Sequence, residues 1–171
     1  PEANSCARRM PDVGRPSSVV TTVSADLSDL ERQGLIARKT SDPRAVAGWR
    51  DRSRADVELS RDIATKFPVR SLTIAYEAGL RACAGILDLA GYRVRSQQGH
   101  HSAMIAAAET VLGDAFAPTL KRLDLARRYR NDDLYGEAAP PSAAQRDEAI
   151  ADAEVLLREL DRRLATAGRR A

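Results

Sequence analysis

Two arginines lie on what should be the buried side of a helix in residues 120–136, LKRLDLARRYRNDDLYG. A helical projection of this segment places Arg127 and Arg130 on the same arc as its apolar side chains. An arginine is rarely buried without a partner, because its charge would lose hydration. We therefore expect these guanidinium groups either to pair with carboxylates or to line a cleft or subunit interface that is open to an anion.

The sequence around Arg130 suits phosphate chemistry. A guanidinium offers a phosphate a fork of donors, and the amide of Asn131 and the phenol of Tyr135 could fix a neighbouring oxygen. RNA can be cleaved without a metal ion when its own 2′-hydroxyl attacks the adjacent phosphate, if a base accepts the proton and a cation stabilises the charge. An unperturbed tyrosine stays protonated near neutral pH, so Tyr135 is a poor base.

His100 and His101 are the other candidates for proton transfer, because histidine titrates near neutral pH. A catalytic role requires one ring within hydrogen-bond reach of the Arg130 site. Otherwise both rings are structural donors or solvated residues. The sequence contains no Gly-rich phosphate loop, HExxH motif, nucleophile elbow or cysteine–histidine cluster, so we expect neither a metal site nor a cofactor.

The composition favours helices over sheet. Aromatic residues make up 4% of the 171 residues, while alanine, leucine, arginine and glutamate are abundant. We expect an all-α protein with a disordered or loosely packed leader at 1–24 and a single domain at 25–168. The formal charge of +3 permits contact with nucleic acid but does not require it. No apolar run could span a bilayer and the start lacks an export signal, so a cytoplasmic protein without membrane contact is expected.

Apolar periodicity and capping residues predict the elements that must position these side chains. A short turn is expected at 26–33, followed by an apolar clip at Leu35 and Ile36. Longer helices are expected at 43–66, 71–90, 102–112, from 117 through the arginine-rich segment, and at 142–168. Residues 91–101 are expected to form a loop.

Two helix faces carry more specific expectations. Gly79 and its neighbouring alanines allow another helix to approach closely, and this face could also pack between subunits. Asp56 has two candidate partners: Arg52 of its own helix, or an arginine of the segment 120–136 that it would orient.

Three segments in order resemble a HEPN domain, the helical higher eukaryote and prokaryote nucleotide-binding family. They are AYEAGLRACAGILDLAGYR, the following GHH and the late RRYRNDD-LY, and the resemblance covers about residues 26–165. It is nearest to a bacterial subgroup with an Arg-Asn pair and a downstream tyrosine. Arg130 and Asn131 match the first two motif positions, and Tyr135 stands where the family signature has a histidine.

The resemblance implies a four- or five-helix up-and-down bundle that forms a homodimer, with motif arginines from two subunits meeting in a cleft. It implies binding of RNA or nucleotides through Arg127, Arg130, His100 and His101. It also implies a metal-independent endoribonuclease of toxin–antitoxin or defence type, with Arg130, Asn131 and Tyr135 at the catalytic site and a nucleotidyltransferase-like antitoxin as partner. The tyrosine in place of histidine leaves open whether such a protein cleaves RNA or only binds it.

Two alternatives come from other classes. Residues 26–44 resemble the recognition-helix and wing end of a winged helix, which would make the chain a DNA-binding regulator. A helical interaction module without chemistry is the other, in which Arg127 and Arg130 only pair with acids such as Asp56. Salt-dependent binding of nucleic acid separates that module from the other two hypotheses.

Overall fold

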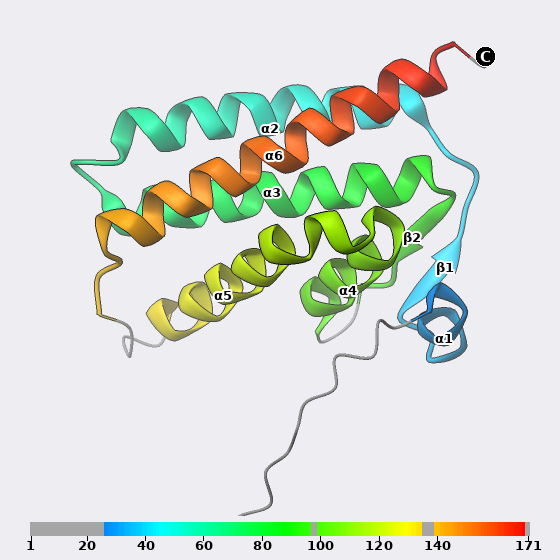
Figure 1. Cartoon of the computed structure of the whole chain (residues 1–171), viewed down its shortest axis with the longest axis horizontal. Helices are drawn as coiled ribbons and strands as arrows, with labels where there is room; N and C mark the ends of the chain where they lie inside the picture. Colours follow the sequence, from blue (N-terminus) through cyan, green and yellow to red (C-terminus); the bar gives the residue numbers. More distant parts are fainter. Residues whose placement is uncertain (1–25, 97–98, 135–138, 170–171) are drawn as a thin grey trace, which may run out of the picture.

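The computed structural model describes residues 26–96, 99–134 and 139–169, and within these ranges it contains six α-helices and one two-stranded sheet (Figure 1). The predicted leader at 1–24 and Tyr135 lie outside the described residues. The elements are α1 (Leu27–Arg32), β1 (Ile36–Arg38), α2 (Pro43–Ile63), α3 (Pro68–Leu89), β2 (Tyr92–Val94), α4 (His100–Leu112), a 3₁₀ turn η1 (Asp114–Phe116), α5 (Ala117–Leu134) and α6 (Ala143–Ala167). The prediction of an all-α bundle is confirmed.

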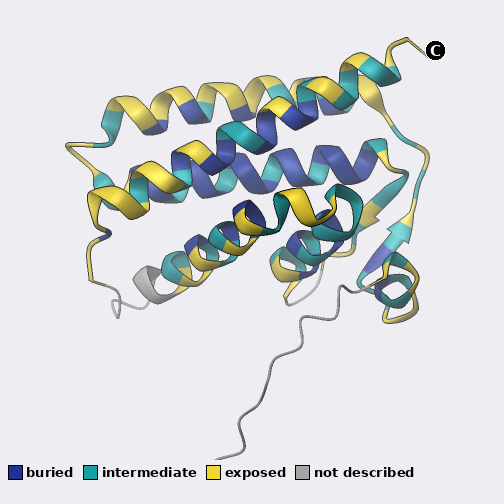
Figure 2. Ribbon diagram, in the orientation of Figure 1, coloured by how far each residue is buried: buried dark blue, intermediate teal, exposed yellow. Residues whose placement is uncertain are grey.

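Helix α3 is the central element of the bundle. It packs against α2 and α6 and also contacts α4 and α5, which lie on its other flank (Figure 1). Of its 22 residues 13 are buried, so nearly its whole circumference is covered (Figure 2). Apolar residues on α2, α4, α5 and α6 complete the core around it. Within the described ranges, no helix combines the length and the apolarity that crossing a bilayer requires.

The capping residues place the helix starts largely as predicted. Pro43 opens α2, and the Asp42 carboxylate accepts a hydrogen bond from the Ala45 backbone N–H at 3.0 Å. Ser142 and Gln145 form the expected capping box at the start of α6. Helix α3 begins earlier than predicted, at Pro68, because a proline in the first turn lacks only an N–H group that has no helical partner there.

The two strands were not predicted. Ile36–Arg38 pairs antiparallel with Tyr92–Val94, with Ile36 opposite Val94. The expected loop at 91–101 is therefore wrong in two places, since it contains β2 and its last two residues are the first turn of α4. Strands of three residues are too short for an alternating pattern to be recognised, and these two are far apart in the sequence. The apolar clip is confirmed at Ile36, which is fully buried.

Gly79 allows close packing as predicted, but within one chain. A Cβ atom added there would lie 3.0 Å from Leu123 Cδ1 of α5 and 3.6 Å from Ala153 Cα of α6. This face is thus covered by the chain's own helices, and the expectation that it packs between subunits is wrong. Both predicted partners of Asp56 are also wrong, because its carboxylate accepts a hydrogen bond at 2.6 Å from Arg81 of α3.

Candidate nucleic-acid interface

Side chains from three helices gather where α3, the start of α4 and the second half of α5 meet. Tyr76 of α3 is fully buried, and its hydroxyl lies 2.9 Å from Nδ1 of His101, the second residue of α4. Arg127 and Arg130 of α5 are close enough to affect the pKa values of both Tyr76 and His101. The group is referred to below as the Arg–His cluster and consists of Tyr76, Glu77, His100, His101, Asp124, Arg127 and Arg130.

His101 is held in its neutral form. Burial lowers the pKa of its imidazole, and the positive charges of His100, Arg130 and Arg127 lower it further. The rings of His100 and His101 meet edge to face, with centroids 4.2 Å apart. A cation is also unfavourable in the first turn of a helix, where the helix dipole is positive. Because α4 begins at His100, the helix dipole and the neighbouring positive charges both favour the neutral form of His101.

The Tyr76–His101 hydrogen bond decides what the imidazole can do. Burial raises the pKa of the Tyr76 hydroxyl far above its usual value, against the opposing effects of Arg130 and Arg127, so the phenol stays protonated. If His101 Nδ1–H donates to the Tyr76 oxygen, Nε2 carries a lone pair and can accept a proton. If Tyr76 donates instead, Nε2 carries the proton and can donate it. The direction of the Tyr76–His101 hydrogen bond thus determines whether Nε2 can accept a proton or donate one.

Arg127 is fixed by a carboxylate of its own helix. Its Nε donates to Asp124 Oδ1 at 2.7 Å, and Arg128 Nε donates to the other oxygen of Asp124 at 2.9 Å. Burial raises the pKa of the Asp124 carboxyl, but its ion pairs with Arg127 and Arg128 outweigh this and lower the pKa below its usual value. Asp124 is therefore ionised and orients two guanidinium groups at once.

Arg130 is held more loosely than Arg127. Its Nε lies 3.5 Å from Glu77 Oε1 of α3, and the two side chains are 29% and 45% exposed. Exposed ion pairs of this kind contribute little, and either partner can be exchanged for another ion. Arg130 is consequently paired within the chain and still accessible to an anion from solvent. The sequence predicted pairing and accessibility as alternatives, and the structure combines them.

A broad groove between α4 and α5 meets the Arg–His cluster at Asp124. It encloses about 1110 Å³ and includes Asp124 and Arg128 in its wall. Acidic Glu109 and Asp114 and basic Lys121 also line it, so its charge is mixed rather than uniformly positive. The Arg127 and Arg130 guanidinium groups lie outside the wall of the groove, which offers space beside the cluster.

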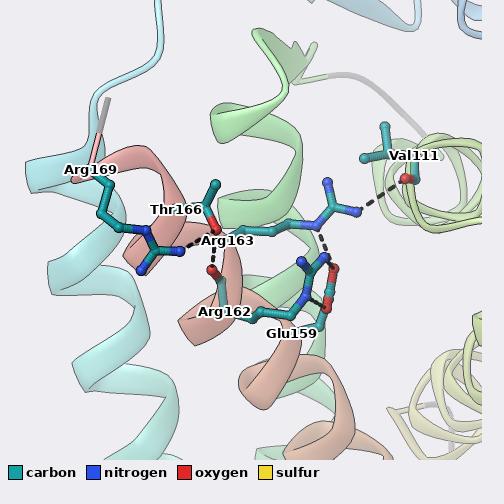
Figure 3. A network of polar contacts seen from close by, with 6 residues as sticks. All are labelled: Val111, Glu159, Arg162, Arg163, Thr166 and Arg169. Atoms are coloured by element: carbon teal, nitrogen blue, oxygen red, sulfur yellow. Dashed lines mark hydrogen bonds and ion pairs between the residues drawn. The ribbon is translucent and has the colours of Figure 1, made fainter. Parts of the chain in front are cut away.

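Helix α4 is held in place by a polar network with α6 (Figure 3). Arg163 donates to Glu159 Oε1 at 2.6 Å and to the backbone carbonyl of Val111, in the last turn of α4, at 3.3 Å. Glu159 also accepts hydrogen bonds from Arg162. These bonds, together with the one from Arg163, lower the pKa of the Glu159 carboxyl although burial raises it. The network therefore satisfies a carbonyl at the C-terminus of the helix whose N-terminus carries the histidines.

The structure brings together four of the predicted site residues: Arg127, Arg130, His100 and His101. Asn131 is exposed on α5, one turn beyond Arg127, and Tyr135 lies outside the described residues. Tyr76, Glu77 and Asp124 were missed as members of the site. Tyr76 follows the apolar pattern of α3, so only its hydrogen bond to another helix distinguishes it from a packing residue.

Among the described residues, no three or more histidine, cysteine, aspartate or glutamate side chains are grouped as a metal site. Comparison with family models, curated proteins and solved structures found no match to the chain. The resemblance to HEPN domains therefore stays a prediction, and the interpretation of the Arg–His cluster depends on its own geometry.

Proposed function

We propose that this protein is an RNA-binding protein of the HEPN type and that the Arg–His cluster cleaves the bound RNA without a metal ion. The observation that supports this proposal is the convergence of a neutral His101 with Arg127 and Arg130 at one place, from two helices. A base that is neutral near pH 7 and two permanent cations are what attack by a 2′-hydroxyl requires.

The proposed reaction uses groups of the RNA and of the cluster only. The 2′-hydroxyl attacks the adjacent phosphorus while His101 Nε2 accepts its proton, and Arg130 and Arg127 stabilise the negative charge on the phosphate oxygens. The bond to the 5′-oxygen then breaks, and that oxygen takes a proton from the imidazolium or from water. The products are a 2′,3′-cyclic phosphate and a 5′-hydroxyl. Asn131 and Tyr135 of the motif are proposed to orient the RNA beside this site.

The test is incubation of the purified protein with single-stranded RNA in the presence of EDTA. Arg130→Ala and His101→Ala should each reduce cleavage by roughly 100-fold or more, because each removes a group that acts in the transition state. Arg44→Ala serves as the matched control, since Arg44 is an exposed arginine at the start of α2. Equal cleavage by all four proteins would rule out this site.

A helical interaction module without RNA chemistry has a separate observation in its favour. Glu77 and Asp124 already pair with the two arginines, which suits an interaction module whose cluster only holds helices together. If Arg130→Ala changes neither RNA affinity nor cleavage but lowers the free energy of unfolding, that second function is the correct one.

The affinity of the purified protein for duplex DNA, measured beside its affinity for RNA, tests the hypothesis of a DNA-binding regulator. The segment in question forms the six-residue α1 and β1, where Arg38 already contacts Glu31 and the Tyr92 ring. A homodimer and a nucleotidyltransferase-like antitoxin partner remain part of the proposal. Sedimentation of the purified chain tests the first, and co-purification from the source cell tests the second.

A further inference from the structure

A second cavity, of about 510 Å³, lies away from the Arg–His cluster, where the two-stranded sheet, α2, the end of α3 and α4 come together. It is referred to below as the Trp49 pocket. Its wall includes Lys39, Trp49, Leu87, Asp88, Tyr92 and Met104. Its volume falls within the range of pockets that hold small organic ligands, roughly 300 to 1000 Å³.

The polar side of the Trp49 pocket is a fixed lysine. Asp88 is only 2% exposed, and its Oδ2 accepts a hydrogen bond from Lys39 Nζ while its Oδ1 accepts one from the Asp42 backbone N–H at 2.8 Å. Both carboxylate oxygens are therefore used within the fold. The Lys39 ammonium has three N–H donors and a side chain that is 27% exposed, so donors remain for a ligand.

Apart from the exposed Arg93, the rest of the wall is apolar and aromatic. Trp49, the only tryptophan of the chain, and Tyr92 supply flat surfaces, and Leu87 and Met104 supply aliphatic ones. The Arg38 guanidinium lies 5.2 Å from the centre of the Tyr92 ring, which steadies that ring. The charged residues that line the pocket are Lys39, Arg93 and Asp88, which leaves a surplus of one positive charge.

We propose that the Trp49 pocket binds a small aromatic anion, with its ring against Trp49 and its carboxylate on Lys39. A cation would be repelled by the fixed ammonium, and an aliphatic acid would leave the aromatic wall without a partner. A neutral aromatic molecule would leave the remaining lysine donors unpaired. The Trp49 pocket shares no residue with the Arg–His cluster, so this binding is independent of RNA.

The probe is 2-naphthoate, and the readout is the single indole N–H signal of Trp49 in a proton–nitrogen NMR spectrum of the full chain. We expect a saturable shift with 2-naphthoate, and binding of the neutral analogue 2-naphthamide that is about tenfold weaker or more. Butyrate should produce no saturable shift. An absent shift with 2-naphthoate, or equal affinity for the acid and the amide, would overturn the proposal.

Three variants locate the binding. Ala84→Leu fills the pocket from α3 and should abolish the shift, while Ala55→Leu makes the same change at an exposed position of α2 and should leave it intact. Lys39→Met should make the acid and the amide bind equally. Since that variant leaves Asp88 without its ammonium partner and could unfold the chain, Ala84→Leu carries the test independently. Unchanged binding by a folded Ala84→Leu protein would contradict the assignment.

Discussion

At the scale of single residues, the neutral state of His101 has a measurable consequence for stability. Its folded pKa lies below the usual 6.5, first because of burial and then because of His100, Arg130 and Arg127. Between the lowered pKa and about 6.5 the unfolded chain binds more protons than the folded one. The contribution of His101 to stability is therefore complete above pH 6.5 and is lost as the pH falls through this window.

This predicts that wild-type protein loses free energy of unfolding between about pH 7.5 and pH 5.5, and that His101→Gln loses less. Urea unfolding at the two pH values measures the difference. Asp124 and Glu159, whose pKa values lie below their usual 3.8 and 4.5, stabilise the fold throughout this pH range and lose their contribution only at more acidic pH, so they do not interfere. The same pH dependence in both proteins would show that His101 is not held neutral by the fold.

The loose pair between Arg130 and Glu77 predicts that the carboxylate competes with RNA. In Glu77→Gln the guanidinium loses its anionic neighbour, so RNA should bind about two- to fivefold more tightly, in keeping with the small energy of an exposed ion pair. Glu58→Gln, at an exposed position of α2, makes the same charge change elsewhere. Fluorescence anisotropy with labelled RNA measures both. Equal gains in the two variants would mean that only net charge matters.

The sequence located some site residues and not others for a physical reason. Arg127 and Arg130 stand out because a cation on an apolar arc is a conflict within one helix, visible without a structure. Tyr76 creates no such conflict, since a buried tyrosine is ordinary until its hydroxyl needs a partner. That partner, His101, is supplied by another helix, and sequence periodicity carries no information about which helices meet.

At the scale of elements, Gly85 of α3 and Gly48 of α2 test how tightly the helices pack, because both are helical and only Gly85 has close neighbours. A Cβ added at Gly85 would lie 3.0 Å from Leu160 Cδ1 and 3.2 Å from Val46 Cγ1, whereas one added at Gly48 meets nothing within 4 Å. Gly85→Ala should lower the free energy of unfolding by about 1–2 kcal/mol, because overpacking outweighs the gain in helix propensity. Gly48→Ala should raise it by about 0.5–1 kcal/mol. Urea unfolding compares them, and stabilisation by both would mean that α2, α3 and α6 pack more loosely.

The helices were predictable because each carries its own signals, such as Asp42 before Pro43 or Ser142 three residues before Gln145. The strand pair was not, because Ile36–Arg38 pairs with Tyr92–Val94, which is distant in the chain. Strand β2 in turn forms one wall of the Trp49 pocket. Sequence reasoning could therefore anticipate the arginine-rich site more readily than this pocket.

At the scale of the whole molecule, charge is nearly balanced. The 27 lysines and arginines and the 24 acidic residues leave a net +3, which is too little to attract RNA over a long range. Binding must then come from a few local contacts, and Arg127 and Arg130 of the cluster are the proposed ones. Each phosphate contact releases counterions, so the salt dependence of binding counts the contacts.

For single strands the slope of log K against log salt is about −0.7 per phosphate contact. One copy of the chain with two arginine contacts should give a slope of about −1.4, and a homodimer that joins two clusters on one RNA should give about −2.8. Arg130→Ala should reduce the magnitude by about 0.7 for each copy engaged, because one phosphate contact is lost. Anisotropy titrations over a range of salt, with sedimentation at matching concentrations, measure slope and stoichiometry together. A slope near zero, or one that Arg130→Ala leaves unchanged, would show that the cluster does not bind phosphate. A slope of about −1.4 from a protein that sediments as a dimer would mean that the two clusters bind RNA separately.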